Sequence, residues 1–343
     1  MFSNAKFVFS RSKILEEYNK ISEISDLLAY SVKTNTYIVP VLEEKKECRF
    51  LIHHINEIKY IKNKENIIYM LHSPEKEELD LIFQNNISFF IVDNKKDLEY
   101  FLEYLEKNNK KVNLLLRMRI KEYTVNTGKY FVYGMYSNQI NELILKLKEN
   151  KNIEKIGVHF HRKTQNLSEW NLVKELEETL SSQTFENIDF LDIGGGIPID
   201  YKNIKAETIK DVYNKIKILK EFLNKKNIKM IIEPGRAIAG PSGKLICNIK
   251  NIVENTIFID ASVFNSQMDI IVSNIKLLVD GERESGSYFV IKGLTPASED
   301  IFRYRVYLEN PKVGGQIIFL NAGAYIYHTD LFSLDKLKVE FVD

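Results

Sequence analysis

The sequence predicts an α/β chain in which a (β/α)8 TIM barrel is followed by a β-rich domain. Up to about residue 240, short apolar runs alternate with longer segments of helical period, which is typical of βα units. Eight such runs are present, and this number fits a closed barrel better than an open doubly wound sheet. After Pro241 the pattern changes to strand-like pieces separated by turns, which indicates a second domain.

The eight runs define the strands expected in the barrel. Segments of helical period separate most of them, for example 73–86, 93–111 and 166–182. In chain order the expected strands are 27–32, 48–54, 66–71, 87–92, 111–119, 153–161, 190–195 and 228–234.

The β-rich part is expected to include the beginning of the chain as well as its end. The apolar run "AKFVFSR", residues 5–11, comes too early for the first barrel strand, so we expect it to pair with the late sheet. This gives a barrel domain over residues 12–242 and a β-sandwich or β-barrel domain formed by 1–11 plus 243–343. The later strand-like pieces are 243–264, 287–294, 313–327 and 336–343.

Composition argues for a small ligand. The chain has 48 Lys+Arg against 47 Asp+Glu, so no charge excess suggests a nucleic-acid or membrane partner. The two cysteines, Cys48 and Cys247, lack metal-ligand spacing and fit a reducing compartment. No apolar run approaches the length of a membrane span or a signal-peptide core. We expect a cytoplasmic protein that holds no metal.

Chemically useful residues follow the expected strands, where the loops of a TIM barrel build its active face. Lys33 follows the first strand, Arg117 ends the fifth, and His159 and His161 end the sixth. The run Gly194, Gly195, Gly196 follows the seventh strand, and Glu233, Pro234, Gly235, Arg236 follow the eighth.

Each of these residues, taken alone, also has a purely structural explanation. Lys33 can simply mark a strand end, because lysine reaches solvent easily. His161 can be satisfied by a backbone carbonyl, and the glycine run can be a tight turn. Glu233 is harder to explain in this way, because a carboxylate beside the apolar run "IKMII" needs a cationic or hydrogen-bonding partner.

Together these residues call for one ligand. The glycine run exposes backbone N–H groups to an anion, and loops after strands seven and eight commonly bind phosphate. Glu233 suits a protonated ring nitrogen, and Lys33 supplies an amine for an aldehyde. Pyridoxal 5′-phosphate carries all three matching groups.

Five motifs in order resemble those of the fold-type III pyridoxal-phosphate-dependent decarboxylases, the ornithine/diaminopimelate/arginine decarboxylase family, whose barrel is of the alanine-racemase type. They reach from the first strand almost to the end of the chain. The motifs are "AYSVKTN" (29–35), "GVHFHRKTQN" (157–166), "LDIGGGIP" (191–198), "EPGR" (233–236) and "NAGAY" (321–325).

The resemblance implies three catalytic residues and a cofactor site. Lys33 would form the internal aldimine, His161 would stack on the cofactor ring, and Glu233 would keep the pyridine nitrogen protonated. Arg117 and Asp192 would belong to the network around the ring and the substrate amine. The further cofactor-binding residues would be Thr164, Gly194, Gly195, Gly196, Gly235, Arg236 and Tyr325.

The resemblance also implies α-decarboxylation of an amino acid such as ornithine, lysine, arginine or diaminopimelate, by a homodimer with shared active sites. Lys129 would pair across the dimer with Asp300. One departure concerns the cysteine that the family usually delivers from the partner subunit. In "GLTPASED", residues 293–300, Pro296 and Ala297 stand at that place, so the usual acid for the product carbon is missing.

Two other functions are compatible with the same motifs. Amino-acid racemases share this barrel, but they typically place arginine at the pyridine nitrogen, so Glu233 favours decarboxylation. A regulatory protein that has lost catalysis would explain the missing cysteine, but it would have no reason to retain Lys33 and the phosphate-binding residues.

Overall fold

A computed structural model describes residues 4–120, 133–204 and 206–343. The chain divides into two compact units. One unit comprises residues 19–198 and 210–235, and the other holds the remaining described residues. The domain limits expected from the sequence, at 11/12 and 242/243, stay a prediction.

The first unit is a closed barrel of eight parallel strands, as the sequence predicts. Neighbours in the chain are neighbours in the barrel, and pairing of β2 with β9 closes it. The strands are β2 (Leu27–Ser31), β3 (Arg49–Ile52), β4 (Ile67–Leu71), β5 (Phe89–Val92), β6 (Val112–Arg117), β7 (Ile153–His159), β8 (Phe190–Asp192) and β9 (Lys229–Ile232).

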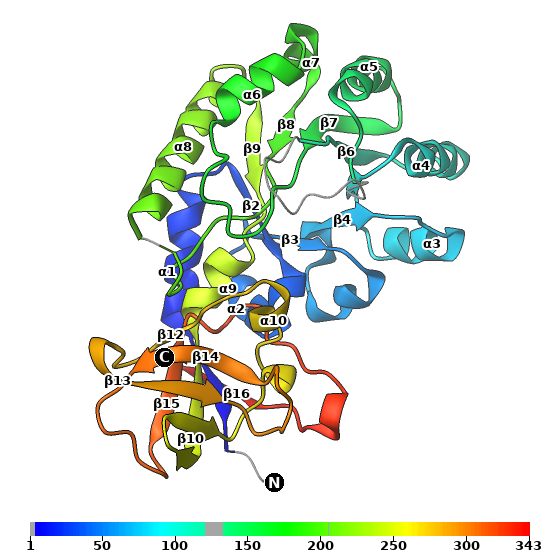
Figure 1. Cartoon of the computed structure of the whole chain (residues 1–343). Coiled ribbons are helices and arrows are strands. Elements are labelled where there is room, and N and C mark those ends of the chain that lie inside the picture. Colours follow the sequence, from blue (N-terminus) through cyan, green and yellow to red (C-terminus); the bar gives the residue numbers. More distant parts are fainter. Residues whose placement is uncertain (1–3, 121–132, 205) are drawn as a thin grey trace. The chain divides into compact units, whose positions relative to one another are not determined.

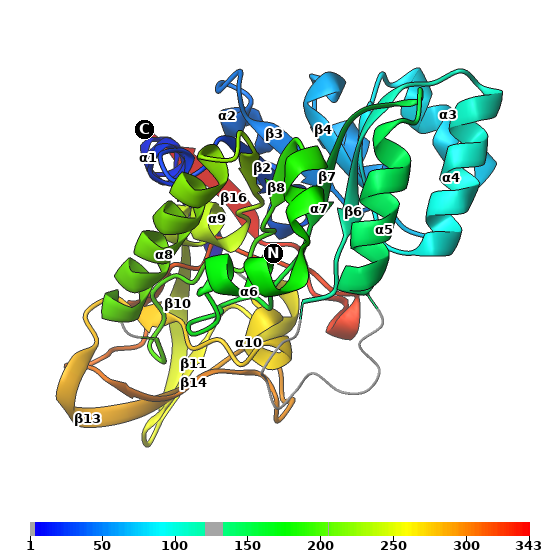
Figure 2. The ribbon, with the colours of Figure 1, turned by 90° about the horizontal axis from the view of Figure 1, so that it is seen from above.

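Helices follow most of these strands and cover the barrel from outside. In both views α3, α4 and α5 lie on the outer side of the strands from β4 to β7 (Figure 1, Figure 2). The helices of the chain are α1 (Arg11–Ser22), α2 (Val39–Leu42), α3 (Lys76–Gln84), α4 (Lys95–Lys107), α5 (Ser137–Lys148), α6 (Leu172–Thr179), α7 (Ser182–Asn187), α8 (Ala206–Asn224), α9 (Arg236–Ser242) and α10 (Asp269–Val272). Within the described residues, no helix is both long and apolar enough to cross a bilayer.

The second unit is built around an eight-stranded, mostly antiparallel sheet. Strand β1 pairs antiparallel with β10 and parallel with β16, so the prediction that the early run joins the late sheet is confirmed. The strands are β1 (Lys6–Ser10), β10 (Gly243–Val253), β11 (Thr256–Ile259), β12 (Leu278–Val279), β13 (Arg283–Lys292), β14 (Ile301–Tyr307), β15 (Gln316–Leu320) and β16 (Lys338–Val342).

Close packing inside the barrel depends on Gly157 in β7. A Cβ at this position would lie 2.3 Å from the carbonyl oxygen of Phe190 and 2.7 Å from Cδ2 of Leu115. Backbone cannot move aside as a flexible side chain can, so no other residue fits without shifting β8.

We therefore expect Gly157→Ala to destabilise the protein by about 1–3 kcal/mol, the usual cost of overpacking a core. Urea unfolding measures the change. Glu154→Ala, at an exposed position of the same strand, is the control and should stay within about 0.5 kcal/mol of wild type. Equal stability of Gly157→Ala and wild type would contradict the packing described here.

Candidate active site

A layer of polar side chains lies inside the barrel at the carboxyl ends of its strands. Side chains of a strand alternate between its two faces, and the apolar cluster inside the barrel includes Leu51 of β3, Ile91 of β5, Leu115 of β6, Phe190 of β8 and Ile231 of β9. The residue two positions later must therefore face inward as well, one level nearer the carboxyl end. Those residues are His53, Asp93, Arg117, Asp192 and Glu233, and the same count from Gly157 gives His159.

Lys33 lies next to this layer, in a short 3₁₀ turn rather than on a strand. Strand β2 ends at Ser31, whose N–H donates to the carbonyl of Pro234 at 3.2 Å, and the turn η1 (Val32–Thr34) follows. The Lys33 side chain is exposed, yet the protein around its amine lowers the pKa by desolvation, which Glu233 and Glu57 partly offset. A lysine with a lowered pKa is more often neutral and hence nucleophilic.

Glu233, Asp192 and His159 form a buried cluster. Oε2 of Glu233 lies 3.4 Å from Nε2 of His159. One ring nitrogen of His159 and one carboxylate oxygen of each acid all lie within 4.8 Å of one another. All three side chains are almost completely inaccessible to solvent. Two carboxyl groups and an imidazole this close together can accommodate one positive charge.

Burial determines the protonation of this cluster. Desolvation raises the pKa of Glu233 to about 7 and raises that of Asp192 well above its usual value, with Glu233 adding to the effect on Asp192. Desolvation also lowers the pKa of His159 to about 4, so its ring is neutral at pH 7. The pair of carboxyl groups consequently retains a proton near neutral pH until a cation arrives.

Arg117 is anchored by Asp93. Its Nη1 donates to Oδ1 of Asp93 at 3.4 Å, and the same oxygen accepts the N–H of Gly134 at 2.9 Å. The guanidinium lies over the Tyr133 ring, 5.2 Å from its centre. Asp93 thereby fixes a cation at the end of β6.

His161 is held by the glycine loop. Its Nδ1 accepts the N–H of Gly195 at 3.3 Å, and desolvation lowers its pKa well below the usual value. Gly194 donates to Asp192 at 2.9 Å, and its carbonyl accepts the N–H of Glu233 at 2.8 Å. The loop therefore connects the sixth, seventh and eighth strands of the barrel into one surface.

Glycine is required at several positions of this surface. Gly194 and Gly196 have φ angles of 67° and 90°, which other residues rarely adopt. A Cβ on Gly195 would lie 2.6 Å from the carbonyl oxygen of Glu233, and one on Gly235 would lie 2.0 Å from Oγ1 of Thr34. Such a backbone leaves room for a ligand to approach closely.

Arg236 follows Gly235 directly in the chain but belongs to the other unit, together with Tyr325. Its Nη1 lies 2.6 Å from Oδ2 of Asp269 and 3.0 Å from the hydroxyl of Tyr201. The Tyr325 ring lies under its guanidinium at 4.7 Å. These contacts hold the Arg236 side chain in one orientation.

Three further residues expected in the site from the sequence, Thr164, Lys129 and Asp300, have different surroundings. Thr164 is half-buried in the loop after β7, and Lys129 lies outside the described residues. Arg162, in the same loop as Thr164, is buried, and its guanidinium pairs with Glu169 and Glu175. Asp300 is buried, and its carboxylate accepts hydrogen bonds from Thr295 and Val263.

Sequence reasoning missed several residues of the site and its surroundings. His53 and Asp93 could have been found by counting two residues on from the inward-facing apolar residues of their strands, Leu51 and Ile91. The carboxylate of Glu57 accepts the N–H of His53 at 2.6 Å. Its sequence signal is weaker: it is an acid three residues after His54, where the turn begins. Tyr201 and Asp269, which hold Arg236, give no sequence signal that we can name.

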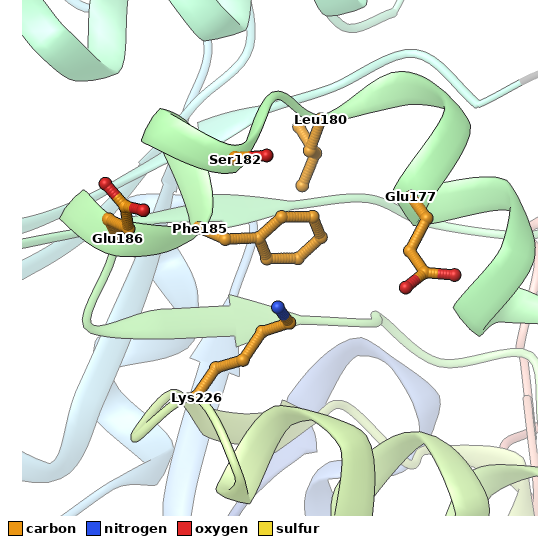
Figure 3. Close-up of a pocket in the computed structure, with 6 residues that line it drawn as sticks. All are labelled: Glu177, Leu180, Ser182, Phe185, Glu186 and Lys226. Carbon is orange, nitrogen blue, oxygen red and sulfur yellow. The ribbon is translucent and has the colours of Figure 1, made fainter.

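A separate hollow of about 420 Å³ lies outside the barrel, between the α6–α7 connection and the end of α8 (Figure 3). Lys226 there lies over the rings of Phe185 and Phe222, 5.1 Å from each centre. The lining residues come from helices and loops away from the carboxyl ends of the strands, so we do not assign it to the site.

Comparison with known proteins decides the family. The model described as "Pyridoxal-dependent decarboxylase, pyridoxal binding domain" matches residues 12–240, which include the whole barrel and its glycine loop. The chain belongs to the pyridoxal-dependent decarboxylase family.

Individual relatives of this decarboxylase family member share sequence or fold with it. Diaminopimelate decarboxylase of Aquifex aeolicus is 25% identical, over 94% of this chain and 82% of the relative. Diaminopimelate decarboxylase from Helicobacter pylori, solved with L-lysine, has a TM-score of 0.83 at 21% identity, covering 99% of this chain and 92% of that chain. Lysine/ornithine decarboxylase from Vibrio vulnificus, solved with cadaverine, has a TM-score of 0.79 at 19% identity, covering 99% and 94%.

The described residues of this decarboxylase family member fit the pyridoxal phosphate that the family binds. The buried acid cluster suits a protonated ring nitrogen, and the lysine with its lowered pKa suits the aldehyde. The glycine loop, in which added Cβ atoms would collide with backbone, suits a phosphate held by N–H groups. Oγ1 of Thr34 and Nδ1 of His159 are buried without hydrogen-bond partners in the part of the chain that the structure describes.

In the cofactor-free protein, Glu233→Gln should gain stability relative to wild type as the pH rises. Folded Glu233 has a pKa of about 7 against a usual value of 4.5, so it binds its proton more tightly in the folded state. Its contribution is fully present below pH 4.5 and is lost as the pH rises through 7. The amide cannot ionise, so the variant should gain about 1–3 kcal/mol between roughly pH 5 and pH 8.

Urea unfolding of the apoprotein at both pH values measures this gain. Glu154→Gln, on the exposed part of β7, is the control and should show the same pH dependence as wild type. A difference between Glu233→Gln and wild type that is equal at both pH values would contradict a raised pKa.

Proposed function

We propose that this protein is a carboxy-lyase that uses pyridoxal 5′-phosphate to remove the α-carboxyl group of a diamino acid. The observation that supports this most strongly is the buried pair Asp192 and Glu233, at the carboxyl ends of β8 and β9. An acid at the pyridine nitrogen, in place of the arginine typical of racemases, favours a protonated ring. When bound, the cofactor supplies an electron sink for the bond to the departing carboxylate.

In this proposal Lys33 binds the aldehyde covalently. Its lowered pKa makes the neutral amine available, and its place in η1 puts the amine at the open end of the barrel. His161 holds the face of the ring, in an orientation fixed by the N–H of Gly195.

Glu233 and Asp192 hold the proton on the ring nitrogen. Water is excluded around them, which strengthens their attraction to the developing cation. Arg117 adds a fixed positive charge at the end of β6, where Asp93 anchors it. The residues Thr164, Gly194, Gly195, Gly196, Gly235, Arg236 and Tyr325 are proposed to bind the rest of the cofactor, chiefly its phosphate.

The proposed substrate class comes from the relatives. Proteins named diaminopimelate decarboxylase share 22–25% identity over more than nine tenths of this chain. Neighbours in fold include lysine/ornithine and arginine decarboxylases. The amino acids in all of these enzyme names carry a second basic group.

Incubation of the loaded protein with L-ornithine, L-lysine, L-arginine and meso-diaminopimelate, with CO2 release as the readout, tests the proposal. No release from any of the four would contradict it.

Lys33→Ala should lose the absorbance band of covalently bound cofactor and reduce turnover by roughly a thousandfold or more, since the amine is the covalent group. Absorbance after addition of pyridoxal phosphate, followed by CO2 release, measures both losses. Lys62→Ala, at an exposed position after η3 (Ile55–Tyr60), is the control and should retain the band. A Lys33→Ala protein that keeps both the band and the turnover would overturn the assignment.

We further propose a homodimer in which Lys129 and Asp300 belong to the interface, and a cytoplasmic location. The latter is supported by Cys48 and Cys247, which are both buried and free.

Lys129→Glu should weaken the dimer, because it reverses the charge that the proposed interface has at this residue. Sedimentation velocity should show a dimer for wild type and a larger monomer fraction for the variant at equal concentration. Lys146→Glu, on the exposed face of α5, is the matched charge reversal and should sediment as wild type. A wild-type monomer with full activity would contradict the shared site.

A further inference from the structure

His53 is a residue of the polar layer that no role above requires. It follows β3 directly, two positions after Leu51, so its side chain faces the barrel interior. The register of β2 and β3 pairs Ser31 with Leu51, which places Lys33 and His53 at the same level of neighbouring segments. The turn η1, which carries Lys33, contacts β3.

The backbone holds His53 in a fixed position. Oε2 of Glu57 accepts the N–H of His53 at 2.6 Å and the N–H of His54 at 3.1 Å. The His54 side chain in turn accepts the N–H of Asn56 at 3.2 Å, which closes the start of η3. A residue held in this way is oriented before any ligand binds.

One nitrogen of the His53 ring has no partner. Its Nδ1 is buried and makes no hydrogen bond among the described residues, and in the tautomer with the proton on Nε2 it is an acceptor. A buried nitrogen without a partner costs about 1–3 kcal/mol, a cost that a bound donor removes. His161, which also lies near Lys33, already uses its Nδ1 to accept from Gly195.

The charges around His53 keep it neutral. Burial, together with the nearby Lys33, His159 and Arg117, lowers its pKa to about 3, while Glu57 is the acid on its own turn. The ring therefore has a free lone pair at neutral pH. A substrate carboxylate that enters beside Lys33 and Arg117 opposes their effect and raises the affinity of the ring for a proton.

The proposed reaction needs a proton carrier at this place. A substrate amine arrives as an ammonium ion, loses one proton before it can attack the aldehyde carbon, and loses a second proton once it is bound there. The Lys33 nitrogen leaves that carbon and takes up two protons, so that it ends as an ammonium ion. The exchange balances when both protons lost by the substrate nitrogen end on the Lys33 nitrogen, each nitrogen carrying one hydrogen while it is joined to the carbon.

We propose that His53 carries these protons one at a time: its Nδ1 accepts a hydrogen bond from the substrate nitrogen, takes a proton, and passes it to the departing amine of Lys33. Each time, an N–H bond of the substrate breaks as the bond to Nδ1 forms, and delivery to Lys33 regenerates the neutral ring, which can then carry the second proton. This inference rests on the proposed function, because it requires Lys33 to hold the aldehyde.

Amine exchange without decarboxylation tests the role. The loaded protein is mixed with 1,5-diaminopentane, which has no carboxyl group to lose, and the change in cofactor absorbance is followed by stopped flow across a range of pH. In His53→Ala the exchange rate should fall roughly a hundredfold, the usual contribution of a proton-transferring side chain. The remaining rate should rise tenfold per pH unit, because only the free amine then reacts, and added imidazole should restore part of it.

Two further variants make the result specific. His53→Gln, which is close in size and can accept but not carry a proton, should be as slow as His53→Ala, and it carries the test if the smaller variant fails to fold. His54→Asn, which retains an acceptor for the N–H of Asn56, should exchange as wild type.

Exchange within twofold of wild type in the His53 variants, or slow exchange that imidazole does not restore, would overturn the inference. A wild-type protein that binds no cofactor would instead contradict the proposed function. The two failures are therefore distinguishable.

Discussion

The alternation of side chains along eight short parallel strands decides which residues meet in this protein. Because the strands are parallel and closed into a ring, the inward positions fall into layers. One layer is apolar and forms the barrel core. The next layer toward the carboxyl ends is polar on most strands, and the site occupies it. A shift of one residue in any strand would turn its polar group away from the site.

In the polar layer, the buried acids lack a cationic partner, and the basic side chains lie close to other positive charges. Asp192 and Glu233 are buried together and retain a proton, whereas Lys33, His53 and His159 lose theirs more readily than usual. Desolvation is the main cause on both sides. A ligand that brings a basic ring nitrogen to the acids and an aldehyde to the lysine relieves both imbalances at once. This complementarity supports pyridoxal phosphate more directly than any single motif does.

Much of the fold could be predicted, because periodicity and strand number are local properties. All eight barrel strands and the pairing of β1 with the late sheet agree with the sequence. The sequence predicted that Lys33 follows the first strand, but not that this strand ends at Ser31 and that Val32 already belongs to the turn, since the apolar run continues to Val32. Residues at strand ends, such as Glu233, stand out in the sequence because they interrupt apolar runs.

The residues that were missed depend on contacts between distant segments. The ion pairs of Arg162 with Glu169 and Glu175 form only when the loop after β7 folds back on α6, so no local pattern indicates them. Asp93 acts through Arg117, which is 24 residues away in the chain. His53 lies in a run of two histidines, and only the strand register shows which of them faces Lys33.

The most direct test of this account is the protonation state of the cofactor ring in the loaded protein. Pyridoxal phosphate labelled with ¹⁵N at the ring nitrogen reports protonation through its NMR chemical shift. The account predicts a protonated nitrogen in wild type near neutral pH and loss of that signal in Glu233→Gln. An unprotonated ring nitrogen in the wild-type protein would contradict it.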